Sequence, residues 1–243
     1  MNRELVVTWK NSNTGRWTPV GKLSYKNRTY YFEYTELAKK AINLGELSPF
    51  INMDDTNKIH TSKKLFPVFE NRLLAKSRPE YSNFYDWLKL SEGSTSPLDE
   101  LAMSGGIRAT DNFQLFLIPK PSLNRYVAYF FSHGIRHLAP SYIDRLRNLK
   151  KGDRLLLLKD VQNPFDSSAL AIRTEDPPEL VGYTPRFFTR DFNKLIESNG
   201  SKNVEISVEK LNLDAPKQYR LLCKISTQWP DGFVPFDNLT NTL

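Results

Sequence analysis

The chain has 243 residues, which is enough for one large domain or two small ones with a hydrophobic core. Its apolar, aromatic and charged residues make up 40%, 12% and 25% of the sequence, which excludes a disordered or collagen-like chain. The formal net charge is +7, and the basic residues are spread along the whole sequence. A distributed charge of this size permits contact with nucleic acid without requiring it.

Cysteine content and hydropathy predict where the chain resides. A single cysteine, Cys223, excludes a disulfide framework and a zinc site built from cysteines. It stands in a strand-like segment, so we expect a small buried side chain. No run approaches the roughly 18 apolar residues of a membrane span, and the N-terminal residues show no cleavable apolar segment. We therefore expect a cytoplasmic chain without membrane contact.

The first half of the sequence predicts a small α+β module. Residues 1–34 are rich in β-branched and aromatic residues and alternate apolar with polar around a turn at residues 26–27, so they predict strands. Residues 35–45 predict a short helix that Thr35 caps and Gly45 ends. One face of this helix is apolar and is expected to be buried: Leu37, Ala41, Leu44.

The rest of this module predicts loops and short helices. Residues 48–64 are polar and predict a loop in which His60 is solvated. Residues 65–90 predict short helices, and residues 98–106 predict a helix that ends at two glycines. Four aromatic residues are expected to form the core of the module: Tyr34, Phe66, Phe69, Trp87.

Pro119 and Pro121 place a domain boundary near residue 120, which gives domains of residues 1–120 and 121–243. The second domain predicts five or six short strands and two helices, with a hairpin formed by residues 203–213 and 218–227. Each of the two helices has one apolar face. In the first helix this face consists of Tyr142, Leu146 and Leu149, and in the second it consists of four residues: Phe188, Phe192, Leu195, Ile196. This pattern favours a small barrel or sandwich with helices over its openings, so the predicted fold class is α+β.

The turn between two of these strands, QNPFDSSAL, puts Phe165 and Asp166 in the middle of a connection. Asn163, Pro164 and Asp166 are turn-forming residues, so one interpretation is a stable turn whose Phe165 plugs the mouth of a barrel. The other interpretation is a binding site, because an aromatic ring can stack on a base and a carboxylate accepts a hydrogen bond from a hydroxyl. The residue types alone leave both interpretations open.

The sequence does not predict catalysis. His133 and His137 are four residues apart but have no third ligand at metal-binding spacing, so we expect no metal. There is no nucleophile motif and no phosphate-binding loop. Glu209 and Lys210 resemble the acidic and basic residues of a nuclease strand only weakly, because successive side chains of a strand point to opposite faces of the sheet. We therefore expect no enzymatic activity and no cofactor.

Four blocks of the second half resemble a HIRAN domain over residues 126–227: SHGIRHL, LKKGDRLLL, NPFDSSALAI and VGYTP. The resemblance implies a compact OB-like β-barrel with helices, which binds the 3′ end of single-stranded DNA. It implies that Asp166 accepts a hydrogen bond from the terminal 3′-hydroxyl and that Phe165 lies against the terminal nucleotide. The other positions implied to contact the DNA are Arg136, His137, Asn163, Tyr183 and Arg186.

Charge and hydrogen bonding give these implied contacts a mechanism. A carboxylate accepts from a hydroxyl but repels a phosphate, so Asp166 would select free 3′-hydroxyl ends. Arg136 and Arg186 would hold the last phosphates. Phe165 and His137 would stack on bases without reading their sequence. Together with the resemblance, these contacts lead us to expect a non-enzymatic protein that captures single-stranded 3′ ends in DNA repair or defence. The combination of this domain with the module before it resembles prokaryotic HIRAN proteins.

Residues 18–106 resemble the N-terminal subdomain of HipA-type toxin kinases, through the segments VGKLSYKNRTYYFEY, LSPF, LFPVFENRLL and LDELAMSGG. No nucleotide-binding loop or HRD-like segment follows them, so the resemblance does not extend to a kinase. It implies a module that contacts a protein. The alternative function is therefore an adaptor of a toxin, kinase or nuclease system, in which residues 1–120 dock a protein partner and the HIRAN-like domain is structural.

Overall fold

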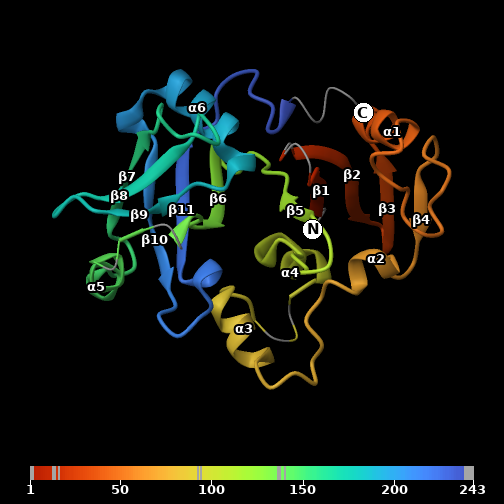
Figure 1. Cartoon of the computed structure of the whole chain (residues 1–243), viewed down its shortest axis with the longest axis horizontal. Coiled ribbons are helices and arrows are strands. Elements are labelled where there is room, and N and C mark those ends of the chain that lie inside the picture. The colour runs from red at the N-terminus through yellow and green to blue at the C-terminus, as the bar shows by residue number, and fades with distance from the viewer. Residues whose placement is uncertain are drawn as a thin grey trace. The chain divides into compact units, whose positions relative to one another are not determined.

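The structure is a computed structural model that describes residues 3–12, 15, 17–91, 93, 95–135, 138–139 and 141–237. The described chain forms two compact units: one holds the residues up to Ile118 together with Asp237, and the other holds Pro119–Phe236 (Figure 1). The domains of residues 1–120 and 121–243 stay a prediction from the sequence. Each unit is built on one antiparallel sheet with accompanying helices, so the predicted α+β class is confirmed.

The first unit holds a five-stranded antiparallel sheet in the order β4-β3-β2-β1-β5. Its strands are β1 (Arg3–Lys10), β2 (Trp17–Lys26), β3 (Thr29–Tyr34), β4 (His60–Ser62) and β5 (Phe113–Leu117). Its helices are α1 (Glu36–Asn43), α2 (Pro67–Glu70), α3 (Tyr81–Trp87) and α4 (Pro97–Ser104). β2 and β3 form a hairpin whose turn is Asn27–Arg28, one position after the predicted turn at residues 26–27, and both turn residues adopt a positive φ.

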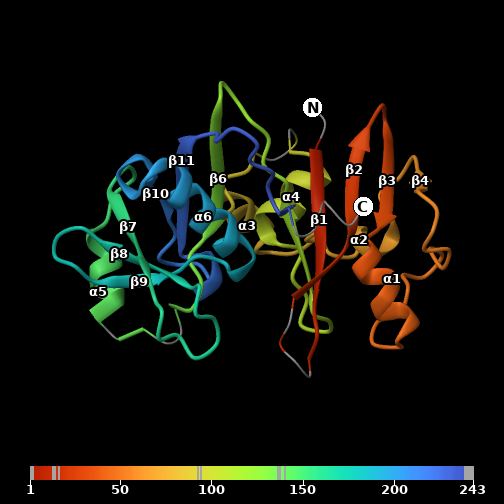
Figure 2. The same ribbon diagram turned by 90° about the horizontal axis from the view of Figure 1, so that it is seen from above.

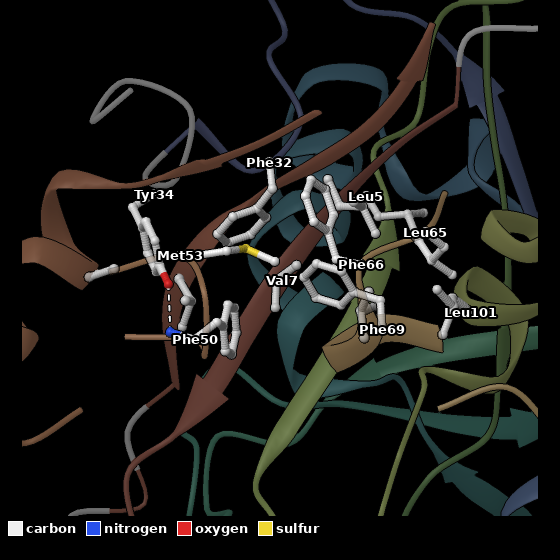
Figure 3. Close-up of a cluster of buried hydrophobic side chains, with 14 of the residues drawn as sticks. Leu5, Val7, Phe32, Tyr34, Phe50, Met53, Leu65, Phe66, Phe69 and Leu101 are labelled. Atoms are coloured by element: carbon white, nitrogen blue, oxygen red, sulfur yellow. Dashed lines mark hydrogen bonds between the residues drawn. The ribbon is translucent and has the colours of Figure 1, made fainter. Parts of the chain in front are cut away.

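A cluster of buried aromatic and aliphatic side chains fills the first unit (Figure 3). Tyr34, Phe66 and Phe69 belong to this cluster, as predicted, whereas Trp87 is half-buried outside it. The Tyr34 hydroxyl accepts a hydrogen bond of 2.7 Å from the Phe50 amide, so the polar end of this core residue is satisfied. Burial raises the pKa of Tyr34 to about 12, so the hydroxyl remains protonated.

Two sequence predictions were wrong in this unit. Leu44 was expected on the buried face of α1, but it is 73% exposed, and the residues of α1 that are buried are Ala38 and Ala41. His60 was expected in solvent, but it is buried at the start of β4. The His60 Nε2 lies 2.9 Å from the Asp55 carbonyl oxygen, which satisfies a ring nitrogen of the buried imidazole.

The second unit holds a six-stranded antiparallel sheet in the order β6-β11-β10-β7-β8-β9. Its strands are β6 (Arg125–Phe131), β7 (Arg154–Lys159), β8 (Leu170–Thr174), β9 (Leu180–Tyr183), β10 (Glu205–Leu211) and β11 (Leu221–Gln228). Helices α5 (Ser141–Asn148) and α6 (Arg186–Asn199) lie at opposite ends of this curled sheet (Figure 1 and Figure 2). The predicted hairpin is β10–β11, and Cys223 of β11 is buried as expected.

A β-bridge joins the two edges of this sheet. His133, just beyond β6, and Tyr183, the last residue of β9, exchange two backbone hydrogen bonds of 2.9 Å. The Ser132 hydroxyl adds a bond of 2.8 Å to the Val181 carbonyl. Because β6 and β9 are the two edge strands, these bonds close the sheet on itself at one point, in agreement with the predicted OB-like barrel.

Helix α6 packs through the aromatic face that its sequence predicts. Phe188 and Phe192 are buried and stack with their ring centroids 5.3 Å apart. Asp191 is buried beside them, and its two carboxylate oxygens lie 3.0 and 3.2 Å from the amide nitrogen of Phe236, from which they accept. These contacts fix the orientation of α6, which begins at Arg186, one of the predicted contact residues.

Candidate nucleic-acid interface

The predicted contact residues that the structure describes come together at one place in the second unit. Asn163, Phe165 and Asp166 lie on the turn between β7 and β8, which we call the β7–β8 turn (residues 160–169). Tyr183 ends β9, and Arg186 is the first residue of α6. Arg136 and His137 lie outside the described residues, so their roles in phosphate binding and stacking stay predictions.

Asn163 builds the β7–β8 turn. Its Oδ1 accepts hydrogen bonds from the backbone amides of Phe165, at 3.0 Å, and Asp166, at 3.2 Å, in the manner of an Asx turn. Its Nδ2 donates to Oδ2 of Asp160 at 3.1 Å. The Asn163 amide group is therefore engaged within the turn, which favours a positioning role over the direct DNA contact that the resemblance implied.

Asp160 links the β7–β8 turn to β9. Its Oδ2 accepts a hydrogen bond of 3.0 Å from the Tyr183 hydroxyl as well as the bond from Asn163. Burial, the hydrogen bond to Asp160 and the negative charge of Asp160 raise the pKa of Tyr183, so the phenol is a donor at neutral pH. Sequence reasoning missed Asp160, because its role depends on a contact with a strand more than twenty residues further along the chain.

The Phe165 side chain points away from the core of the barrel. It is 81% exposed, so the interpretation that it plugs the barrel mouth is wrong. Val161, on the same turn, is 64% exposed, so the tip of the turn presents two apolar side chains to solvent. Single exposed apolar residues are common, but an accessible ring beside charged groups is a surface on which a base can stack.

Asp166 faces its own turn on one side and the start of α6 on the other. Its Oδ1 accepts a hydrogen bond of 3.0 Å from the Ser168 amide, and its Oδ2 lies 3.5 Å from Nε of Arg186. The Asp166 and Arg186 side chains are 21% and 49% exposed, so water screens this ion pair and a ligand can reach both groups. Each carboxylate oxygen has two lone pairs, so Asp166 can accept from a further donor while it stabilises the turn.

The start of α6 adds positive potential beside this ion pair. The N-cap residue is Pro185, which provides no side-chain cap, and the first turn of the helix contains no acidic residue. The positive end of the helix dipole therefore lies next to the Arg186 guanidinium. Asn193, further along α6, donates to the Ser168 carbonyl at 3.1 Å and so connects the helix to the β7–β8 turn. Sequence reasoning also missed Asn193.

Neither a metal site nor a membrane span is found in the described part of the chain. Among these residues no three or more His, Cys, Asp or Glu side chains gather where they could hold a metal ion. No helix among them is both long enough and apolar enough to cross a bilayer. Burial lowers the pKa of His133 to about 4, so this imidazole is neutral at neutral pH and adds no positive charge to the site.

The second unit, with its exposed turn beside the basic start of a helix, has a counterpart among known protein families. Residues 126–230 match the HIRAN domain family. The match confirms the predicted resemblance over residues 126–227. HIRAN domains bind DNA 3′ ends in known members, so the match supports a DNA-binding role for this chain.

Two solved structures are similar to parts of the chain. A protein from Lactobacillus plantarum is 16% identical, with a TM-score of 0.31, over 42% of this chain and 99% of that one. The HIRAN domain of human HLTF is 12% identical, with a TM-score of 0.32, over 48% of this chain and 82% of that one. No curated protein matches the chain. These comparisons do not support the resemblance of residues 18–106 to the HipA subdomain, which stays a prediction from the sequence.

Proposed function

We propose that the second unit captures the 3′-hydroxyl end of single-stranded DNA at the β7–β8 turn, and that the chain acts by binding without catalysis. The observation that carries the proposal is the combination at the tip of this turn. The exposed Phe165 ring stands next to Asp166, whose accessible carboxylate is paired with Arg186. The HIRAN match supports DNA as the ligand of this surface.

Each of these three groups has a separate task in the proposed complex. The terminal 3′-hydroxyl donates a hydrogen bond to Asp166, whereas a 3′-phosphate meets its negative charge and is repelled. The Arg186 guanidinium has five N–H donors, so it can hold a phosphate oxygen by charge-assisted hydrogen bonds. The Phe165 ring stacks on the terminal base, which gives little sequence preference because every base has a π face.

Arg136 and His137 keep the roles that the resemblance implied, a second phosphate contact and a second stacking surface. Free 3′-hydroxyl ends arise wherever a strand is cut or a fork is processed. We therefore propose DNA repair or defence in the cytoplasm of a prokaryotic cell as the setting of this activity.

The strength of binding is expected to depend on the chemistry of the 3′ end. We expect a 5′-labelled single strand with a free 3′-hydroxyl to bind at least several-fold more tightly than the same strand with a 3′-phosphate. The reason is the negative charge of Asp166 at the position of the terminal group. The measurement is fluorescence anisotropy of the full chain at low salt, where phosphate contacts are strongest.

Two variants separate this mechanism from general charge effects. Asp166→Ala should abolish the preference, because it removes both the acceptor and the repulsion. Asp144→Ala, which removes an exposed carboxylate from α5, should retain the preference. Equal binding of the two strands by the wild-type protein would contradict end capture. The adaptor alternative would instead show no DNA binding at low salt together with a protein that co-purifies with the chain.

A further inference from the structure

We infer that the exposed face of α6 carries the DNA strand away from its captured 3′ end, with Arg186, Arg190 and Lys194 in contact with successive phosphates. The inference rests on the proposed function and extends it from the end of the strand to the path of the strand. It assigns a binding role to Arg190 and Lys194, neither of which sequence reasoning singled out.

The spacing of these three residues matches a single strand that runs along the helix. They recur at every fourth position, so they are neighbours on one side of α6. Each step of four residues advances about 6 Å along the helix axis, which is of the order of the distance between successive phosphates in an extended single strand. Arg186 and Arg190 are exposed and Lys194 is partly exposed. We call this row of cations the α6 stripe.

The packing of α6 explains why the α6 stripe faces solvent. The opposite side of the helix is buried against the barrel through its apolar residues: Phe188, Phe192, Leu195. The bond from Asn193 to the Ser168 carbonyl places the β7–β8 turn alongside the flank of the α6 stripe. A strand whose last nucleotide lies at Phe165 and Arg186 can therefore continue directly onto Arg190.

Acidic residues mark both ends of the α6 stripe. Asp166 lies at its beginning, where the free hydroxyl is expected. Glu197, an exposed residue three positions after Lys194, ends the run of positive charge. The α6 stripe therefore extends over about two helical turns, and its three cations could meet three successive phosphates, one each. The strand would run from its 3′ end at the N-terminus of α6 towards the C-terminus.

The test is a length series of single strands, from a dinucleotide to a decamer, each with a 5′ label and a free 3′-hydroxyl. For the wild-type protein we expect affinity to rise with length until three phosphates are covered and then to level off. In the double variant Arg190→Ala/Lys194→Ala, the decamer should lose affinity several-fold and approach the dinucleotide. The slope of log K against log salt should become shallower by about 1.4, since each single-strand phosphate contact contributes about 0.7.

Three controls decide what a change in the double variant means. Arg190→Gln/Lys194→Gln, which keeps long polar side chains, should show the same loss with an unchanged unfolding temperature. Arg147→Ala removes an exposed arginine from α5, at the other end of the sheet (Figure 1), and should leave the series unchanged. The double variant should also keep its preference for a 3′-hydroxyl over a 3′-phosphate.

The possible outcomes distinguish the path of the strand from the capture of its end. A wild-type preference for 3′-hydroxyl ends, with the same length dependence and salt slope in the double variant, would overturn the α6 path and leave end capture intact. An equal loss in Arg147→Ala would also overturn it, because net charge would then explain the effect. A wild-type protein that binds both kinds of end equally would overturn end capture and, with it, the α6 path.

Discussion

Phe165→Ala is expected to weaken binding of single-stranded DNA by about 1–3 kcal/mol, or roughly 5- to 150-fold in Kd, without lowering the unfolding temperature. The ring is 81% exposed, so its removal costs the folded protein little apolar burial. In the proposed complex the same ring stacks on the terminal base, and alanine cannot replace that contact. The measurement is the anisotropy titration of the end-capture experiment, together with thermal unfolding of the variant.

The pattern of the loss identifies stacking as its cause. Strands with a 3′-hydroxyl and with a 3′-phosphate should lose the same factor, because stacking does not depend on the charge of the end. Lower salt should not restore the difference from wild type, since no phosphate contact is removed. Phe165→Tyr should bind like wild type, and Val161→Ala, which removes apolar surface from the same turn, should change affinity little. Unchanged affinity in a folded Phe165→Ala protein would exclude the ring from the site.

The local chemistry of the β7–β8 turn could be predicted from the sequence. The Asn163 side chain accepts hydrogen bonds from the backbone amides of Phe165 and Asp166, and the Asp166 side chain accepts one from the amide of Ser168. These hydrogen bonds join residues that are close in the chain, so the residue types of the segment NPFD are enough to predict the turn. The exposure of Phe165 could not be predicted from these residue types. A turn motif determines the local backbone conformation, but it does not determine which side of the turn packs against the rest of the barrel.

Contacts between distant segments could not be predicted in this way. Strand β5 pairs Leu117 with Leu5 of β1, and no local periodicity in the sequence reveals that partner. The same applies to the bond between Asp160 and Tyr183, and to the bridge that His133 makes with Tyr183. Each of these contacts depends on strand order, which is set by the packing of the whole sheet. The structure brings the described residues of the predicted site together, but the sequence did not reveal Asp160 and Asn193, which connect the β7–β8 turn to β9 and α6.

Helix faces were predictable where the helix is long and its apolar residues are large. The apolar residues Phe188, Phe192 and Leu195 of α6 are buried as the periodicity indicates. Helix α1 is shorter, and Leu44 is its C-cap residue, where the helical repeat ends. The pattern in the sequence continued one position beyond the helix itself, which is why Leu44 was wrongly assigned to the buried face.

Gly182→Ala is expected to lower the stability of the second unit by roughly 2–4 kcal/mol, because overpacking and backbone strain act together at this position. A Cβ on Gly182 would lie 1.7 Å from Oγ of Ser132 and 2.8 Å from the carbonyl oxygen of His133. The φ of Gly182 is +133°, which residues with a side chain rarely adopt. The substitution therefore forces apart the two strand edges that the His133–Tyr183 bridge joins.

Amide hydrogen exchange at Tyr183 is the most direct measurement of this effect, because its N–H donates to the His133 carbonyl across the closure. We expect faster exchange at Tyr183 in Gly182→Ala and a lower midpoint of denaturant unfolding. DNA affinity should fall as well, since Arg186 follows the closure by only three residues and its position depends on the end of β9.

A control glycine, Gly200, and a second substitution at Ser132 separate backbone strain from overpacking as causes of the lost stability. Gly200→Ala has a positive φ of +78° but no atom within 4 Å of the added Cβ, so it reports backbone strain alone and should cost roughly 1–3 kcal/mol. Ser132→Ala in the Gly182→Ala background removes the nearest clashing atom and should recover part of the lost stability, as a double-mutant cycle would show. If Gly182→Ala costs no more than Gly200→Ala and leaves exchange at Tyr183 unchanged, the two edges of the sheet do not meet at this bridge in solution. The start of α6 would then need another explanation for its place beside Asp166.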